Sequence, residues 1–321
     1  MIAVEIRTLG SLWPVSALTL GGGGLGQVWG PTTRDEAVAT AREAVDGGIT
    51  LLDLAPSYGA GEAERVIGAA FGGRLPSGIR ITTKCRVGNT PAAEIPDLLE
   101  RSLDESLDRM KLAYADLFLL HNSLVGAAGE GGERKTPRAL FADAVRPALE
   151  GLVQRGRIGG WGITAVGVPS AVLEVLAEDP APGAAQAIAN LLDSPGEMRW
   201  FAEPARPRDI IAAARGRRCG VMGIRAVQAG ALTAAIDRDL PADHPEVHDY
   251  ARAAGFRHLC AELGANPAVI AHRYALSLDL DTLVLGVKNR QELAECVAAA
   301  QSGPLPPDLI ARIDATVADT R

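Results

Sequence analysis

The sequence predicts an α/β fold of the (β/α)8 TIM-barrel class, with eight parallel strands and a short N-terminal β-hairpin. Short, nearly continuously apolar runs alternate with amphipathic helical stretches along the chain, and such runs are typical of parallel strands that are buried on both faces. Eight strand candidates, each followed by at least one helix, fit a length of 321 residues. No linker-like segment interrupts the alternation, so we expect a single domain over residues 1–321.

The expected elements follow one another in regular order. The strands are placed at the apolar runs 15–20, 49–55, 78–84, 114–121, 157–164, 184–192, 219–227 and 281–287. The helices are placed at 36–48, 62–73, 95–110, 138–156, 169–179, 206–217 and 290–302, with two more helical stretches between 245 and 279. Residues 4–10 are expected to form one arm of a hairpin that caps the barrel floor. The loop-like segments 123–136 and 226–245 are expected over the active face.

The composition excludes several classes of protein. The net charge is −7 and no basic block is present, which argues against a nucleic-acid partner. No apolar run reaches the roughly 18 residues that a membrane helix requires. Because the four cysteines lie far apart, neither a disulfide framework nor a zinc site is expected, and a soluble protein in the reducing cytoplasm fits best. His244 and His248 have helical spacing but no third ligand accompanies them, so no metal site is predicted.

A glycine-rich run, "LTLGGGGLGQVWG" at 18–30, contains the GxGxxG spacing of dinucleotide-binding folds. A Rossmann fold requires a helix that starts within the glycines. Here Pro31 would break such a helix, and the better helix start is near Thr33. No tyrosine is followed by a lysine four positions later, as a short-chain dehydrogenase would require. We therefore interpret the run as a loop after the first barrel strand that brings the backbone close to a ligand.

Ionisable side chains occur where three consecutive strands are expected to end. Asp53 ends the second strand and Tyr58 follows it in the loop, Lys84 ends the third strand and His121 ends the fourth. A barrel gathers such residues at one rim. An ammonium next to a phenol is expected to lower its pKa from about 10, a carboxylate would hold the ammonium in place, and an imidazole would orient a carbonyl oxygen. This group suits protonation of a developing alkoxide during carbonyl reduction, with hydride supplied by a cofactor.

The sequence resembles the aldo-keto reductase family over essentially its whole length. Within the family it is most similar to bacterial members that act on sugars. The segments "LLDLAPSYGAGEAERVIGAAF", "YADLFLLH" and "ALEGLVQRGRIGGWGIT" carry the resemblance. It implies a (β/α)8 barrel that binds NADPH in extended form. It also implies that Tyr58 is the general acid/base, that Lys84 and Asp53 tune it, and that His121 orients the substrate.

The resemblance also assigns residues to the cofactor and substrate. Gln186 matches a glutamine that holds the nicotinamide carboxamide, whereas Thr164 and Ala165 replace the family's Ser-Asn pair on the preceding strand. Ile224 or Arg225 stands where the family often stacks a tyrosine on the nicotinamide. The other residues assigned to the cofactor are Gly22, Gly23, Gly286, Lys288, Arg290 and Glu292. Trp29 and Asn122 are expected to line the substrate pocket.

The choice between the two nicotinamide cofactors depends on the loop after the eighth strand. Lys288 and Arg290 are expected to meet a 2′-phosphate and therefore favour NADPH. Glu292 weakens that argument and keeps NADH as the alternative.

Two other functions remain open at the level of sequence. Lys84 at a barrel strand end would also suit a Schiff-base enzyme of the aldolase type. The altered residues on strands five and seven leave room for a nicotinamide-binding sensor with little turnover. In each case the partner is a small molecule, and the protein is expected to act as a monomer or small homo-oligomer.

Overall fold

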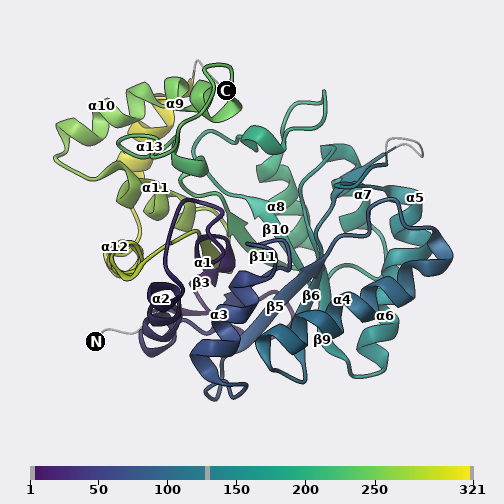
Figure 1. Cartoon of the computed structure of the whole chain (residues 1–321). Helices are drawn as coiled ribbons and strands as arrows, with labels where there is room; N and C mark the ends of the chain where they lie inside the picture. The colour runs from purple at the N-terminus through teal and green to yellow at the C-terminus, as the bar shows by residue number, and fades with distance from the viewer. Residues whose placement is uncertain (1–3, 127–130, 319–321) are drawn as a thin grey trace.

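A computed structural model describes residues 4–126 and 131–318. Its centre is a closed barrel of parallel strands that neighbour one another in chain order (Figure 1). The strands are β3 (Leu18–Gly21), β4 (Leu51–Asp53), β5 (Arg80–Cys85), β6 (Ala115–Leu120), β9 (Ile158–Thr164), β10 (Ala184–Ile188), β11 (Gly220–Ile224) and β12 (Thr282–Leu285). Each coincides with one of the eight runs predicted to be strands, with β3 and β5 ending one residue later than predicted, so the (β/α)8 prediction is confirmed.

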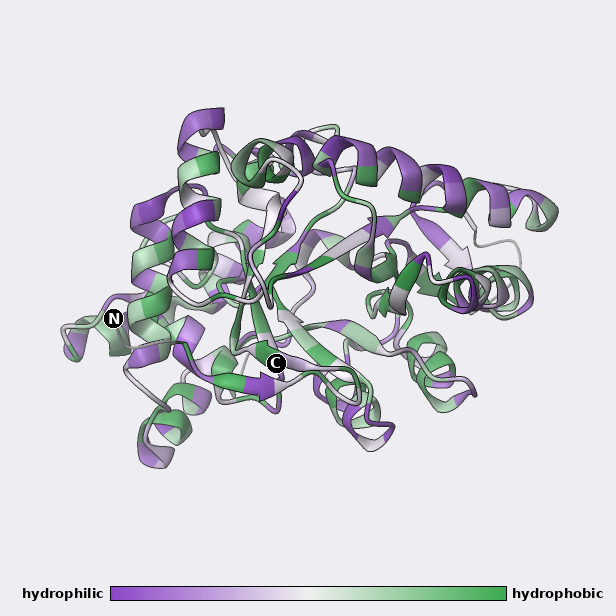
Figure 2. Cartoon of the chain, turned by 90° about the horizontal axis from the view of Figure 1, so that it is seen from below, coloured by the Kyte–Doolittle hydropathy of each residue, from purple (hydrophilic) through white to green (hydrophobic). Residues whose placement is uncertain are grey.

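Helices surround the barrel and return the chain to the start of each next strand. They are α2 (Arg34–Asp46), α3 (Glu62–Phe71), α4 (Ile95–Met110), α5 (Arg138–Leu140), α6 (Arg146–Gln154), α7 (Pro169–Ala177), α8 (Pro207–Gly216), α11 (Pro267–Leu276) and α12 (Arg290–Gln301). Seen from below, hydrophobic residues concentrate in the strands and on the inner helix faces, and hydrophilic residues on the outer faces (Figure 2). No helix among the described residues combines the length and apolar character needed to cross a bilayer.

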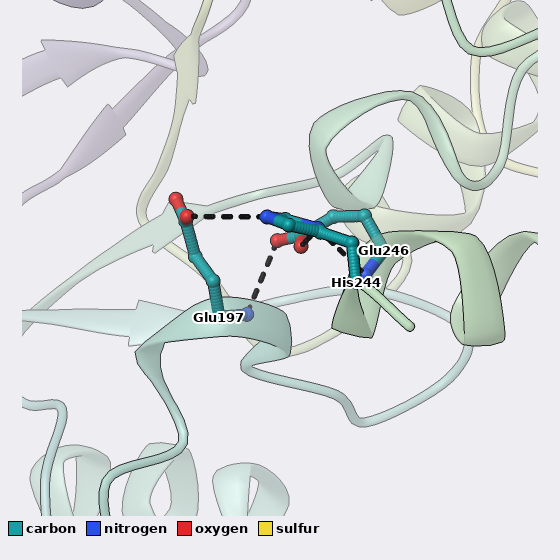
Figure 3. Close-up of side chains that lie close together, drawn as sticks. All are labelled: Glu197, His244 and Glu246. Atoms are coloured by element: carbon teal, nitrogen blue, oxygen red, sulfur yellow. Dashed lines mark hydrogen bonds and ion pairs between the residues drawn. The ribbon is translucent and has the colours of Figure 1, made fainter. Parts of the chain in front are cut away.

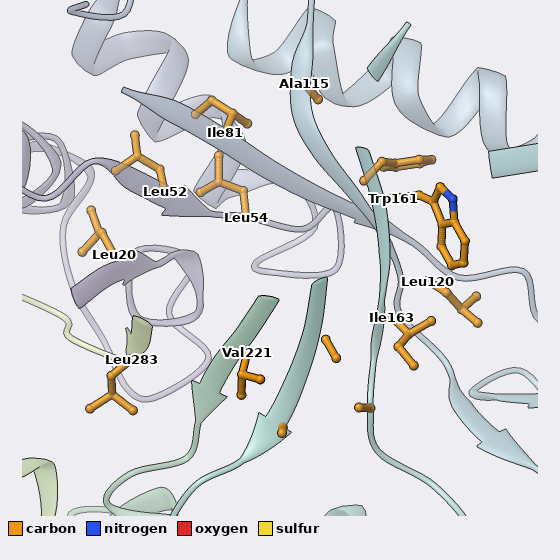
Figure 4. Close-up of a cluster of buried hydrophobic side chains, with 14 of the residues drawn as sticks. Leu20, Leu52, Leu54, Ile81, Ala115, Leu120, Trp161, Ile163, Val221 and Leu283 are labelled. Carbon is orange, nitrogen blue, oxygen red and sulfur yellow. The ribbon is translucent and has the colours of Figure 1, made fainter. Parts of the chain in front are cut away.

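Successive side chains of each strand point alternately to the outside and to the inside of the barrel. Leu52 of β4 and Ile81 of β5 point outward into the layer between strands and helices (Figure 4). Leu51 of β4 and Leu117 of β6 belong to a separate apolar cluster inside the barrel. Because Asp53 lies two residues after Leu51, it shares the inward face at the carboxyl end of the strand. The barrel is therefore apolar below and polar at its upper end.

The predicted N-terminal hairpin closes the barrel floor. β1 (Ile6–Thr8) pairs antiparallel with β2 (Pro14–Ser16). Leu9, in the turn between them, is fully buried in the interior cluster with Leu51 and Leu117. The hairpin therefore seals the lower end of the barrel with apolar side chains.

The glycine-rich run forms one helical turn, α1 (Gly22–Leu25), which was not predicted. A Cβ at Gly24 would lie 1.9 Å from the carbonyl oxygen of Val287, so the glycine is required for contact with the backbone after β12. The long helix α2 begins at Arg34, and the Thr33 side chain accepts a hydrogen bond from the Glu36 amide. The helix start is where the sequence predicts it, and the Rossmann alternative is excluded by the closed barrel.

The C-terminal helices build a second, smaller core beside the barrel. α9 (Pro245–Arg252), α10 (Ala254–Glu262), α11 and α13 (Pro307–Ala315) lie together in Figure 1. Phe256 and Tyr274 are buried there. The sequence predicted two helices between 245 and 279 where three occur, and it did not predict α13. In the segment 123–136, β7 (Ser123–Val125) pairs with β8 (Lys135–Pro137), and residues 127–130 lie outside the described residues.

Candidate active site

A cavity of about 700 Å³ opens at the carboxyl ends of the barrel strands. Most residues that the sequence assigned to the site line it: Gly22, Gly23, Trp29, Asp53, Tyr58, His121, Asn122, Thr164, Gln186, Ile224, Arg225, Gly286, Lys288 and Glu292. Two assigned residues do not. Lys84 lies directly beneath Tyr58, and Arg290 lies outside the lining.

Lys84 is the centre of a buried polar group. Its side chain is 0% exposed and its Nζ lies 2.9 Å from Asp53 Oδ2, 2.7 Å from the Leu54 carbonyl oxygen and 3.2 Å from Tyr58 Oη. An ammonium has three N–H donors, and these three acceptors use all of them. Burial lowers the pKa of Lys84, but Asp53 and Tyr58 outweigh burial and hold the pKa above its usual value. The lysine is therefore a fixed cation.

Tyr58 lies between Lys84 and the cavity. Burial raises the pKa of its phenol, and this outweighs the lowering by Lys84. The expected lowering of the tyrosine pKa is thus wrong in its net direction, because the sequence gave no measure of how deeply the phenol is buried. At neutral pH the phenol keeps its proton, and because its oxygen accepts from Lys84, that proton is available toward the cavity.

His121 completes the group from the end of β6. Its ring meets the Tyr58 ring edge-on, with 5.6 Å between centroids, and its Nδ1 lies 3.4 Å from Ser57 Oγ. Burial, Lys84 and Arg86 together hold the pKa of His121 well below its usual value. The imidazole is therefore neutral near pH 7. The structure brings together all four side chains that the sequence proposed for chemistry.

Two unsatisfied polar atoms face the cavity on β9 and β10. Thr164 Oγ1 and Gln186 Nε2 are buried and find no hydrogen-bond partner among the described residues, and the two residues are direct neighbours in the sheet. A buried polar atom without a partner costs about 1–3 kcal/mol. Thr164 and Gln186 are therefore equipped to bind a polar group that the protein itself does not supply.

The glycine side of the cavity holds Trp29. Its Nε1 would lie 2.7 Å from a Cβ at Gly23 and 3.1 Å from one at Gly286, so both glycines make room for the indole. Arg238 lies over the indole ring at 5.6 Å from its centroid. Trp29 thus packs against the loops after β3 and β12 and lines the same cavity as His121.

The cations expected to meet a 2′-phosphate both have carboxylate partners. Lys288 Nζ lies 2.6 Å from Asp237 Oδ2 and 3.4 Å from Glu292 Oε1. Arg290 pairs with Glu36 at 3.0 Å, on the surface. The sequence did not reveal the pairs with Asp237 and Glu36, because these acids lie 51 and 254 positions away along the chain.

Arg225 is held by a network at the cavity rim, of which Figure 3 draws Glu197, His244 and Glu246. Its guanidinium donates to Gln228 Oε1 at 2.9 Å and to Glu246 Oε1 at 2.5 Å. His244 Nδ1 lies 2.6 Å from Glu246 Oε2, and Glu197 approaches His244 Nε2 at 3.8 Å. The ligand atoms of Glu197, His244 and Glu246 lie within 4.8 Å of one another, a spacing that would suit a metal ion. Because Arg225 already supplies a cation to Glu246, we assign the cluster as an ion-pair network.

Asn122 has a structural role at the edge of the cavity. Its side chain, 1% exposed, accepts a hydrogen bond from the Val87 amide at 2.9 Å and donates one to the Glu133 carbonyl at 3.2 Å. It ties together the loop after β5 and the segment before β8. These segments carry Arg86 and Arg134, two lining residues that sequence reasoning missed. The only signal for Arg86 was its position two residues after Lys84.

Comparisons with known proteins find relatives and structural neighbours over nearly the whole chain. Residues 17–318 match the model of the Aldo/keto reductase family. L-galactose dehydrogenase of Arabidopsis thaliana is 27% identical over 303 residues, which cover 93% of this chain and 89% of that protein. The aldo-keto reductase AKR11C1 from Bacillus halodurans, in its holo form, has a TM-score of 0.73 at 22% identity and covers 98% of this chain and 96% of its own. An aldo-keto reductase from Klebsiella pneumoniae, solved in complex with NADPH, has a TM-score of 0.66 at 20% identity and covers 98% and 95% of the two chains.

The family match spans the barrel and reaches into the C-terminal helices. The two structural neighbours share the fold over nearly the whole chain. The chain therefore belongs to the aldo/keto reductase family and is an NAD(P)H-dependent oxidoreductase.

Proposed function

We propose that this protein interconverts an aldehyde or ketone and an alcohol, with Tyr58 as the general acid/base. The observation that carries the proposal is the hydrogen bond of 3.2 Å from Lys84 Nζ to Tyr58 Oη. The ion pair with Asp53 keeps this lysine charged. The name of the L-galactose dehydrogenase relative supports a sugar-type carbonyl as the substrate class.

The protonation states of the site suit reduction. The phenol of Tyr58 is protonated at neutral pH, so it donates its proton to the substrate oxygen as negative charge develops there. The Lys84 ammonium stabilises the phenolate that is left. Neutral His121 donates a hydrogen bond to the same oxygen and sets its position. In the reverse direction the phenolate removes the proton of the alcohol.

The cavity fits a nicotinamide cofactor. Thr164 Oγ1 and Gln186 Nε2 are the unsatisfied atoms that a carboxamide, with both a donor and an acceptor, would satisfy. Ile224 also lines the cavity, whereas the Arg225 guanidinium forms an ion pair with Glu246. A bound nicotinamide would supply the hydride that no side chain provides.

NADPH is the cofactor that we propose, with NADH as the alternative. Lys288 is the residue placed to hold a 2′-phosphate, and one structural neighbour was solved with NADPH. Binding the phosphate requires Lys288 to exchange Asp237 and Glu292 for the ligand. Carboxylates near the ribose instead favour the 2′-hydroxyl of NADH. The balance between the two cofactors thus depends on these ion pairs.

The structure disfavours the Schiff-base alternative. An amine must lose its proton to attack a carbonyl, whereas Lys84 is buried, uses all three donors and has a raised pKa. Failure of borohydride to trap a carbonyl compound on Lys84 would agree with this reading.

The proposal is tested by the oxidation of NADPH and NADH with a panel of small aldehydes, followed at the nicotinamide absorbance band. Tyr58→Phe should lower turnover by about 10²–10⁴-fold while thermal stability changes little, because only one oxygen is removed. Equal rates in the two proteins would refute the role of Tyr58. Cofactor binding without turnover of any substrate would instead favour the sensor alternative.

A further inference from the structure

Two arginines that line the cavity near Tyr58 and His121 have no partner among the residues that the structure describes. Arg86 and Arg134 both line the cavity with Tyr58 and His121. Within residues 4–126 and 131–318, neither guanidinium forms a hydrogen bond or an ion pair, and Arg86 Nε is buried and unsatisfied. A buried donor of this kind is destabilising when it is left without an acceptor.

The other cations that line the same cavity do have partners. Arg225 pairs with Glu246, Lys288 pairs with Asp237, and Arg238 donates to the Ala229 carbonyl. The protein also carries an excess of acidic residues, with a net charge of −7. Two unpaired guanidinium groups beside the proposed acid/base are therefore not explained by a shortage of carboxylates.

A single buried side chain holds the two arginines near each other. Asn122 bonds to the amide of Val87, which follows Arg86, and to the carbonyl of Glu133, which precedes Arg134. The Arg134 carbonyl in turn accepts from the Ser123 amide at 2.9 Å. Because Asn122 directly follows His121, the backbones of both arginines are fixed relative to the end of β6 that carries the imidazole.

The charges of this group are unbalanced. Burial and the nearby charge of Arg134 lower the pKa of Arg86, and the opposing effects of Glu133 and Tyr58 do not offset them. The Glu133 carboxylate is on an exposed residue and forms no ion pair with either arginine in the described structure. An oxyanion between the two guanidinium groups would relieve their repulsion and supply the missing acceptor for Arg86 Nε. Guanidinium groups match carboxylate and phosphate oxygens in geometry as well as charge.

We propose that the substrate carries, besides its reacting carbonyl or hydroxyl group, an oxyanion group that Arg86 and Arg134 bind. This inference rests on the proposed carbonyl-reducing function. It narrows the substrate class from neutral aldehydes and sugars to carbonyl compounds with a carboxylate or phosphate at the far end from the reacting carbon. Arg86 and Arg134 then act in binding and specificity, while Tyr58 acts on the reacting oxygen.

The experiment compares matched aldehydes that differ mainly in charge. Succinate semialdehyde and butyraldehyde test for a carboxylate, and glyceraldehyde 3-phosphate and glyceraldehyde test for a phosphate. The charged member of at least one pair should have a kcat/KM roughly 10- to 100-fold higher, since one charge-assisted hydrogen bond contributes about 1.5–3 kcal/mol. In Arg86→Gln and in Arg134→Gln this ratio should fall toward one. Arg312→Gln, on the distant helix α13, is the matched control and should keep the ratio.

A binding measurement separates failure of this inference from failure of the proposed function. Succinate and inorganic phosphate, at the ionic strength of a sodium chloride control, should raise the Tm of the wild-type protein. The increase should shrink in both arginine variants, and the exposed Arg134 offers a variant with little risk to folding. If no aldehyde is turned over, the proposed function fails, and the Tm data alone decide the oxyanion site. Equal kcat/KM values within both pairs, or equal Tm shifts in wild type and variants, would overturn the inference.

Discussion

Replacing Asp53 by asparagine would leave the Lys84 ammonium buried without a counter-charge. In the native structure the two side chains are 3% and 0% exposed and 2.9 Å apart. Breaking a buried pair by removing one partner costs about 3–5 kcal/mol, because the remaining charge is uncompensated. Lys84 keeps the Leu54 carbonyl and the Tyr58 oxygen as acceptors, so we expect the lower end, about 3 kcal/mol.

This loss translates into a measurable shift in Tm. Unfolding entropy is about 2.1 cal/mol/K per residue, or roughly 0.7 kcal/mol/K for the whole chain. A loss of about 3 kcal/mol then lowers Tm by roughly 4–5 °C at pH 7. In Asp53→Asn the pKa of Lys84 should fall, because the cause of its elevation is removed. Raising the pH toward 10 neutralises the lysine in the variant, so the difference in Tm should narrow.

Calorimetry of Asp53→Asn across this pH range provides the assay, with the double variant Asp53→Asn/Lys84→Met as the matched control. The double variant removes the stranded charge and should regain at least half of the lost Tm, although both proteins should lose turnover. If Asp53→Asn had the same Tm as the wild type at pH 7, the reasoning would be refuted, because Lys84 would then not depend on Asp53 for its charge.

Three further predictions follow from the site. Asp237→Asn frees Lys288 from an ion pair whose acid is 56% exposed, so NADPH should bind about 5-fold more tightly and NADH equally well in titrations of protein fluorescence. Thr164→Val removes an unsatisfied hydroxyl, so the free protein should be at least as stable while the Kd for either cofactor rises about 5- to 10-fold; an unchanged Kd would contradict the carboxamide assignment. The pKa of His121 is lowered on folding, so its stabilising contribution is present above pH 6.5 and is lost as the pH falls. Urea melts at pH 5 and pH 8 should therefore differ less for His121→Asn than for the wild type.

The barrel and its proposed acid/base group were predictable because each depends on a local pattern. Strand ends are marked by where an apolar run stops, so Asp53, Lys84 and His121 could be placed from the sequence alone. The closed sheet then brings their side chains to one rim whatever their separation along the chain.

The features that the sequence missed depend on contacts between distant loops. Arg134 lines the cavity in a segment that Asn122 ties to the loop after β5 and whose Arg134 carbonyl accepts from the Ser123 amide. The partner of Lys288 lies in the loop between β11 and α9, which carries no periodic pattern. The net rise in the pKa of Tyr58 depends on burial depth, which composition does not encode. Tertiary packing, not local propensity, decides all three.

The β1–β2 hairpin, which closes the barrel floor with Leu9, has a consequence for the timing of proton transfer under the proposed mechanism. Leu9 and its neighbours close the bottom of the barrel, and Lys84 and Asp53 have almost no contact with solvent. Lys84 and Asp53 therefore offer Tyr58 no solvent-exposed path from the barrel floor, and under the proposed mechanism the phenol exchanges protons with water through the cavity that ligands occupy. While ligands fill the cavity, the phenol can transfer only the proton that it already holds. Under the proposed mechanism Tyr58 is therefore reprotonated once per catalytic cycle, after the product has left.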